Sequence, residues 1–315
     1  MNEQIAQLKT ELSKAVVGQE SMIEGLLVGL LCDGHILVEG VPGLAKTTTI
    51  NALSKAIGLD FKRIQFTPDL LPSDIIGAQI YDPKNHSFSI KKGPLFTNLL
   101  LADEINRAPA KVQSALLEVM QERQVTIADE SFKLDSPFLV MATQNPIEQE
   151  GVYALPEAQL DRFMMKIVVH HNSEEEELEI MRKGAGNGFG KVEQVIDKEA
   201  IAALQEAVQK IHMDPQLEHY IVQLITATRA PERFSLESIA ENIMYGVSPR
   251  ASIDLYKAAK AKAFLRGNDF VSPSDIGYMI HNVLRHRIVL SYEARAKGVT
   301  TDEIISAIVE TLPIP

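Results

Sequence analysis

The sequence predicts an α/β fold class for the first part of the chain and an all-helical second part. A short apolar segment, a Gly-rich turn and a helical pattern follow one another at residues 35–57. A second apolar run, at residues 99–104, ends in two acids. Both patterns are typical of buried parallel strands whose carboxyl ends meet at one edge of a sheet. Beyond a Gly-rich segment at 184–190, helical periodicity covers the rest of the chain.

Composition restricts the classes of protein that the chain can belong to. Its 315 residues suffice for one large or two modest domains, and its single cysteine, Cys32, excludes an internal disulfide. A formal net charge of −11 argues against nucleic acid as a partner, because such binding depends on neutralising phosphates. The N-terminus lacks a signal peptide's apolar core, and no window reaches the ~20 apolar residues of a membrane span. We therefore expect a cytoplasmic protein with no membrane span.

The order of the predicted elements follows from hydrophobic patterning. Two pairs of short extended runs, at about 80–90 and 125–134, predict β-hairpins inserted between core elements. In the second part we expect helices and no strands. The core strands are predicted at 35–39, 61–66, 99–104, 137–142 and 164–169. The helices of the second part are predicted at 197–211, 215–229, 249–266, 273–287 and 301–311.

The Gly-rich turn has the context of a phosphate-binding loop, between a strand and a helix. Backbone N–H groups at the helix start would bind phosphates, Lys46 would reach the β- and γ-phosphates, and the Thr47 hydroxyl would bind Mg²⁺. Ala45 stands where the usual motif has glycine, so we expect it to keep a negative φ. A chance Gly/Pro turn before a helix is the alternative. The predicted nucleotide-binding residues are Gly40, Val41, Pro42, Gly43, Leu44, Ala45, Lys46, Thr47 and Thr48.

Polar residues at the ends of two predicted strands complete the expected site. Asp103 would hold Mg²⁺ through water, and Glu104 would act as the general base for an attacking water. A cap for the next helix would also explain these acids taken alone. Asn145 would orient the water and sense the γ-phosphate, and a turn residue before proline is the alternative. Gln65 or Thr67, at the end of another strand, could restrain Glu104.

Two smaller features allow more than one interpretation. Gly18 and Gln19 interrupt two helical patterns, and they mark either a position near the adenine or a simple helix break. Arg285, His286 and Arg287 form a short basic cluster. Either a local basic patch or a solvated helix end explains that cluster.

These motifs occur in the order found in AAA+ ATPases. The segments GVPGLAKT, LLADEINRAPAKVQSALLEVMQE, ATQNPIEQEGVYALPEAQLDRF and GVSPRASIDL resemble the MoxR family, whose own loop also has alanine before lysine. The resemblance implies a P-loop NTPase αβα sandwich with a parallel sheet, the inserted β-hairpins of the helix-2-insert branch and a C-terminal all-α lid domain. We accordingly expect a nucleotide-binding core at 1–183, a linker at 184–190 and a lid at 191–315.

The resemblance also implies a ring, usually a hexamer, with ATP and Mg²⁺ at the subunit interfaces. In that arrangement Arg162 resembles the arginine finger that completes a neighbour's site. Arg250 resembles the second sensor, a lid residue that contacts the γ-phosphate. Arginine suits both roles because it stays charged and binds phosphate in a fork. The alternatives are an ion pair with Asp161 for Arg162, helix-start packing for Arg250, and Arg107 as the interface arginine.

The function implied by the resemblance is that of a Mg-dependent ATPase. Such a protein acts as a chaperone-like motor that remodels, matures or activates a protein complex, often with a partner carrying a von Willebrand factor A domain. The alternatives are a nucleotide-gated scaffold with little turnover, a DNA-directed motor and a magnesium-chelatase-like motor. Having both Asp103 and Glu104 argues against the scaffold. The acidic balance argues against DNA, and the adjacent His170 and His171 alternate across a strand and cannot easily chelate a metal together.

Overall fold

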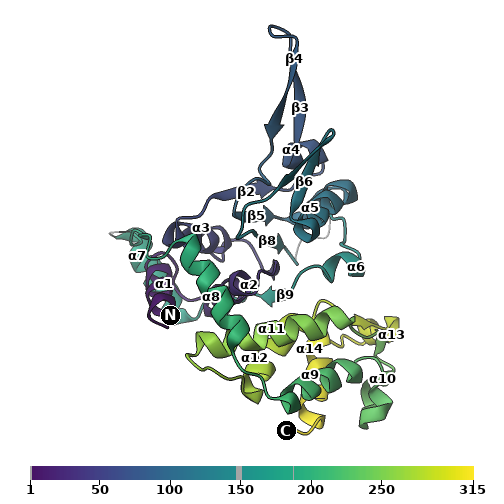
Figure 1. Ribbon diagram of the computed structural model, residues 1–315. Helices are drawn as coiled ribbons and strands as arrows, with labels where there is room; N and C mark the ends of the chain where they lie inside the picture. Colours follow the sequence, from purple (N-terminus) through teal and green to yellow (C-terminus); the bar gives the residue numbers. More distant parts are fainter. Residues whose placement is uncertain (1, 147–150, 187) are drawn as a thin grey trace. The chain divides into compact units, whose positions relative to one another are not determined.

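The computed structural model describes residues 2–146, 151–186 and 188–315 (Figure 1). Contacts between Cα atoms divide the chain, apart from its first two residues, into two compact units. The first unit comprises Glu3–Leu155 and Ile167–Ala202, and the second comprises Pro156–Lys166 and Ala203–Pro315. Among the described residues, no helix is long and apolar enough to cross a membrane.

A five-stranded sheet with the order β2–β5–β8–β1–β9 organises the α/β part of the chain. The pairs β2–β5, β5–β8 and β8–β1 are parallel, which confirms the predicted parallel sheet. The central strands are buried almost throughout, as expected for strands covered on both faces. All five predicted core strands are present: β1 (Ile36–Glu39), β2 (Phe61–Gln65), β5 (Leu99–Asp103), β8 (Leu139–Gln144) and β9 (Met165–Val168).

Two β-hairpins interrupt the α/β order, as predicted. In Figure 1 the first of them extends away from the sheet of its unit. The hairpins are β3 (Gly77–Asp82) with β4 (Ser87–Lys92), and β6 (Gln124–Ile127) with β7 (Glu130–Lys133). The helices in this half of the chain are α1 (Asn2–Ala15), α2 (Glu20–Leu31), α3 (Lys46–Ile57), α4 (Pro72–Ile76), η1 (Ile105–Arg107), α5 (Ala110–Glu122), α6 (Glu157–Leu160) and α7 (Glu174–Ala185).

The five predicted C-terminal helices are confirmed, but the expectation of no strands is wrong. β10 (Ile243–Tyr245) pairs antiparallel with β11 (Val289–Leu290). Strands of two or three residues are too short to show a period of two, so the sequence pattern missed them. The main helices are α8 (Lys198–Lys210), α9 (Pro215–Ala227), α11 (Pro249–Leu265), α12 (Pro273–Leu284) and α14 (Thr301–Thr311), with the short η2 (Pro231–Phe234), α10 (Glu237–Ala240) and α13 (Tyr292–Ala296) between them.

The boundary between the units differs from the predicted linker at 184–190. Helix α7 extends to Ala185, and the residues that follow the linker stay bound to the first unit. The backbone N–H of Val195, for example, donates to the carbonyl oxygen of Ala56 at 2.9 Å. Such bonds explain why the contact boundary lies within α8, after Ala202. The division of function between a nucleotide-binding core and a lid stays a prediction.

His35, directly before β1, is a buried polar group that ties three elements together. The backbone N–H of Val140 donates to its Nδ1 at 3.0 Å, and its Nε2 lies 3.0 Å from the carbonyl oxygen of Met120. A neutral ring with its proton on Nε2 satisfies both contacts. Burial, with a smaller effect from the charge of Arg123, lowers the pKa of His35 to about 3. The folded protein therefore keeps this ring uncharged.

We expect His35 to make the fold acid-labile. Its folded pKa is about 3, so the unfolded chain, with a pKa near ~6.5, binds the proton first as the pH falls. The free energy of unfolding therefore decreases from pH ~6.5 towards ~3, by about 1.4 kcal/mol at pH ~5.5. His35→Gln keeps a donor and an acceptor but cannot titrate. Urea unfolding at pH ~7.5 and ~5.5 should therefore show that its free energy of unfolding falls by about 1.4 kcal/mol less than that of the wild-type protein.

The matched control is His171→Gln, at an exposed position. It should lose as much stability as the wild-type protein over the same pH interval. If His35→Gln also lost as much, the folded state would accept a proton at residue 35 and the buried neutral ring would be the wrong description.

Candidate functional site

The turn between β1 and α3 begins the candidate site. Gly43 has a φ of +88°, and a Cβ added there would meet no heavy atom of the described residues within 4 Å. The side of the loop at Gly43 therefore borders open space. The Lys46 ammonium donates to the carbonyl oxygen of Gly40 at 2.6 Å. Burial lowers the pKa of Lys46, and the nearby charges of Asp103 and Glu104 oppose that shift.

Ala45 adopts a left-handed conformation with a φ of +55°, so the expectation of a negative φ is wrong. This residue is the N-cap of α3. The conformation costs a residue with a Cβ roughly 1–2 kcal/mol compared with the right-handed one. Successive residues of opposite helical hand point their N–H groups into a common concavity, which is an anion-binding arrangement. Alanine at this position therefore carries backbone strain that glycine would not, and it adds the smallest possible side chain.

A single cavity of about 370 Å³ brings the predicted groups of the first unit together. It collects the loop, the end of β5 and the residue after β8, as expected for strands whose carboxyl ends meet. Gly40, Val41 and Leu44 are absent from its described lining, and Leu44 is buried. Asn145 is only 7% exposed and lines it. The lining residues are Pro42, Gly43, Ala45, Lys46, Thr47, Thr48, Arg63, Asp103, Glu104 and Asn145.

The carboxylate of Asp103 accepts hydrogen bonds on both oxygens. The Thr143 hydroxyl donates to Oδ1 at 2.6 Å, and it accepts the backbone N–H of Glu104 at 2.9 Å. Arg63 donates to Oδ2 from Nη2 at 2.6 Å and from Nε at 3.1 Å. Arg63 is not among the predicted site residues. The available signal was strand register, because Arg63 and Gln65 share a face of β2 and Gln65 pairs with Asp103 across the parallel strands.

Glu104 follows β5 in a left-handed conformation with a φ of +56°. Its Oε2 accepts a hydrogen bond from Gln65 Nε2 at 2.8 Å and lies 3.1 Å from Nε of Arg107. Of Gln65 and Thr67, which we considered as restraints on Glu104, it is Gln65 that makes the contact. Whether this contact restrains catalysis stays a prediction.

Gly18 and Gln19 form a helix break with positive φ at both residues. The Gln19 amide donates to the Asn172 side chain at 2.7 Å and to the carbonyl oxygen of His170 at 3.1 Å. Neither residue of the break belongs to the described lining of the cavity. The helix-break interpretation describes the contacts, and a position near the adenine stays a prediction.

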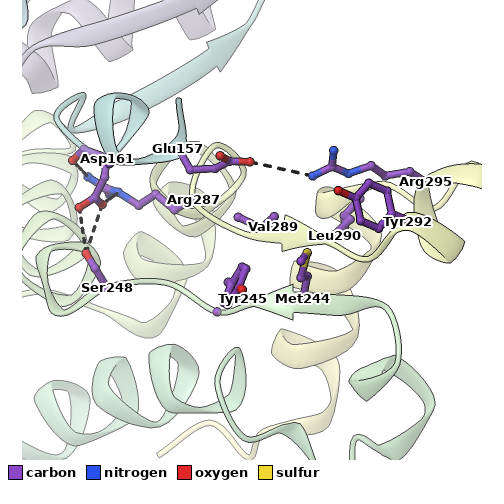
Figure 2. Close-up of a pocket in the computed structure, with 12 residues that line it drawn as sticks. Glu157, Asp161, Met244, Tyr245, Ser248, Arg287, Val289, Leu290, Tyr292 and Arg295 are labelled. Atoms are coloured by element: carbon purple, nitrogen blue, oxygen red, sulfur yellow. Dashed lines mark hydrogen bonds and ion pairs between the residues drawn. The ribbon is translucent and has the colours of Figure 1, made fainter. Parts of the chain in front are cut away.

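Arg162 and Arg250 lie in the second unit, where Asp161 is the centre of an ionic cluster. The Asp161 carboxylate accepts bonds from the Ser248 hydroxyl at 3.1 and 3.2 Å and from Nη1 of Arg250 at 3.1 Å. Arg287 Nε donates to the same carboxylate at 2.9 Å, and Figure 2 shows Ser248 and Arg287 directed at it. Asp161 therefore fixes Arg250 at the start of α11 to the segment that carries Arg162.

His286 and Arg287, the last two residues of the basic cluster at 285–287, are buried, so both interpretations, a surface patch and a solvated helix end, are wrong for them. Helix α12 ends at Leu284, directly before the cluster. The Arg287 side chain is 1% exposed, donates to the carbonyl oxygen of Phe163 at 2.9 Å and forms an ion pair with Asp254. His286 is buried too, and burial lowers its pKa well below the usual range. Buried arginine is tolerated because each donor finds an acceptor.

The groups in the cavity of the first unit fit ATP and Mg²⁺ by their chemistry. The Lys46 ammonium and open space at Gly43 suit phosphates, while the Thr47 hydroxyl and the Asp103 carboxylate are the hard oxygen ligands that Mg²⁺ prefers. The described residues contain no group of three or more His, Cys, Asp or Glu side chains that could hold a metal. The oxygen donors of Thr47 and Asp103 suit Mg²⁺, which usually keeps several waters and binds through one or two carboxylates and the substrate's phosphates.

Comparisons with known proteins agree with this geometry. Residues 35–165 match the ATPase family associated with various cellular activities (AAA), and residues 237–308 match the AAA lid domain. Chaperone MoxR1 of Mycobacterium tuberculosis is 48% identical over 305 residues, which cover 97% of this chain and 81% of that protein. Protein MoxR of Methylorubrum extorquens is 31% identical, with coverages of 98% and 95%.

A crystal structure of a protein from Cytophaga hutchinsonii has the same fold. It superposes with a TM-score of 0.94 at 51% sequence identity, and the match covers 100% of this chain and 96% of the other. One family accounts for the phosphate loop, the acidic strand end and the helical C-terminal part, and the relatives match along nearly the full length of the chain. The chain belongs to the MoxR family of AAA+ ATPases.

Proposed function

We propose that this protein hydrolyses ATP with Mg²⁺ in the cavity between the phosphate loop and the ends of β5 and β8. One observation carries the proposal: a single cavity is lined by Lys46, Thr47, Asp103 and Glu104, which together carry an ammonium, a hydroxyl and two carboxylates. Phosphoryl transfer needs a cation and N–H groups for phosphates, ligands for a metal and a group that orients water. Membership of an ATPase family supports the same activity.

The residues divide these tasks. The backbone N–H groups of residues 40–48, except Pro42, which has none, and the Lys46 ammonium bind the phosphates, and Thr47 with Asp103 would hold Mg²⁺. When bound, Mg²⁺ neutralises the charge that develops on the β- and γ-phosphates. Glu104 accepts a proton from the attacking water, and Asn145 orients that water. Since Gln65 and Arg107 occupy Glu104, we infer that this carboxylate must leave them before it acts.

The second part of the proposal concerns assembly. The core at 1–183 and the lid at 191–315 would form a ring, in the usual case a hexamer, with Arg162 completing a neighbouring subunit's site and Arg250 sensing the γ-phosphate. The bond between Asp161 and Arg250 supports a link between the two arginines, since Asp161 directly precedes Arg162. Arg107 is the rival for the interface role.

ATP hydrolysis would drive work on another protein. We infer a chaperone-like motor that remodels, matures or activates a protein complex. Its partners would be that client complex or a protein carrying a von Willebrand factor A domain. The support is the chaperone name of a relative that is 48% identical over nearly the whole chain.

Replacing the proposed base tests the chemistry. Glu104→Gln should still bind ATP but lower steady-state phosphate release roughly 10²–10⁴-fold, because the amide cannot accept the proton of water. Lys46→Ala should weaken binding of a fluorescent ATP analogue itself. The matched control is Glu118→Gln, an exposed glutamate of α5, which should behave like the wild-type protein. Wild-type turnover in Glu104→Gln would remove Glu104 from its role.

Mixing two inactive variants tests the interface arginine. Arg162→Ala should lower turnover of assembled rings by roughly 10³-fold or more, the scale of known arginine fingers. Mixed with Glu104→Gln protein, it should regain activity, because intact sites then receive the finger of a neighbour. Phosphate release against mixing ratio measures the effect.

The same mixing experiment with Arg107→Ala discriminates between the two arginines. If only that mixture recovered activity, Arg107 would be the finger. An Arg162→Ala ring with normal turnover would place the finger elsewhere.

A further inference from the structure

We propose that Arg63 competes with the metal ion for Asp103, and that this competition links metal binding to the release of Glu104. The inference rests on the proposed function, because it assumes that Asp103 faces Mg²⁺ and that Glu104 is the base. It adds a positioning residue on β2 to that site. The observation behind it is a chain of contacts from Arg63 through Gln65 to Glu104.

The first step is the occupancy of Asp103. Its Oδ1 accepts the Thr143 hydroxyl, which is itself held by the backbone N–H of Glu104. Its Oδ2 accepts two N–H groups of Arg63. A water held by Mg²⁺ would need an acceptor site on this carboxylate, and the two N–H groups of Arg63 fill both sites of Oδ2. Arg63 would therefore have to leave before Oδ2 could accept that water.

Of Asp103 and Arg63, the arginine is the side chain that can move. The Asp103 side chain is 14% exposed and is fixed at the end of β5, whereas the Arg63 side chain is 48% exposed. An ion pair this exposed contributes little to folding stability, so losing it costs the fold little. The arginine tip can swing into solvent while the carboxylate stays. The contact is thus suited to being broken.

The third step connects this movement to the base. Nη2 of Arg63 also donates to Oε1 of Gln65 at 3.0 Å, and Nε2 of Gln65 donates to Glu104 at 2.8 Å. Arg63 thereby fixes which end of the Gln65 amide faces the carboxylate. With Arg63 gone, Gln65 can rotate and its hold on Glu104 weakens. Glu104 stays bonded to Gln65 while Arg63 is paired with Asp103. It is released when a metal ion takes the place of the guanidinium.

Metal affinity measured without turnover tests the competition. The probe is Mn²⁺, titrated into full-length protein saturated with a non-hydrolysable ATP analogue and followed by the electron paramagnetic resonance of free Mn²⁺. Arg63→Gln should bind Mn²⁺ about fivefold more tightly, which corresponds to about 1 kcal/mol at 1.4 kcal/mol per factor of ten. The matched control, Lys62→Gln, removes the same charge from the adjacent exposed residue and should leave the affinity unchanged.

Unchanged or weaker Mn²⁺ binding by Arg63→Gln would overturn the competition, as would an equal gain in Lys62→Gln. Binding of the analogue in EDTA separates this from failure of the proposed function. There Lys62→Gln, outside the cavity, should match the wild-type protein, and Lys46→Ala should bind more weakly. If Lys46→Ala bound the analogue as tightly as the wild-type protein, the nucleotide site itself would be wrong.

A double-mutant cycle tests the link through Gln65. Gln65→Ala removes one acceptor of Arg63, so it should raise Mn²⁺ affinity about twofold in the wild-type background. In the Arg63→Gln background the same change should have no effect. Equal effects in both backgrounds would show that the two side chains act independently, and the proposed link would fail.

Discussion

The candidate site depends on the parallel register of the sheet. Backbone hydrogen bonds pair Gln65 with Asp103 across β2 and β5, and Glu39 with Gln144 across β1 and β8. Because parallel strands present their carboxyl ends at one edge, residues far apart in sequence end side by side. A register shift of one residue in β2 would turn Arg63 and Gln65 to the opposite face. The chemistry of the cavity is thus set by backbone pairing before any side chain makes a contact.

Much of this arrangement could be predicted because it depends on periodicity and on local motifs. Buried parallel strands are continuous apolar runs, and the phosphate loop lies between such a strand and a helix. What could not be predicted depends on contacts between distant segments. Arg63 looks like surface charge until β2 is aligned with β5, and Arg287 looks like a solvated helix end until Asp161 and Asp254 surround it. The conformation of Ala45 was missed because residue preference was weighted above the geometry of the loop.

The second unit shows the same logic with buried charge. A single carboxylate, Asp161, accepts from a hydroxyl and two guanidinium groups, one of them almost fully buried. Breaking such a cluster by removing one partner leaves an uncompensated charge, which costs about 3–5 kcal/mol. The segment that carries Arg162 is therefore attached to α11 and the end of α12 by charge as well as by packing. The role proposed for Arg162 needs a fixed position, and such an attachment provides one.

Two of the non-glycine residues that adopt left-handed conformations, Ala45 and Glu104, line the same cavity. Strain of this kind is tolerated only where the surroundings enforce it. This matters to anyone who engineers the protein for heat resistance. Glycine at Ala45 or Glu104 would relieve that strain, but it would also exchange a preorganised cavity for a more mobile one, so these two positions should be left unchanged when strained residues are replaced.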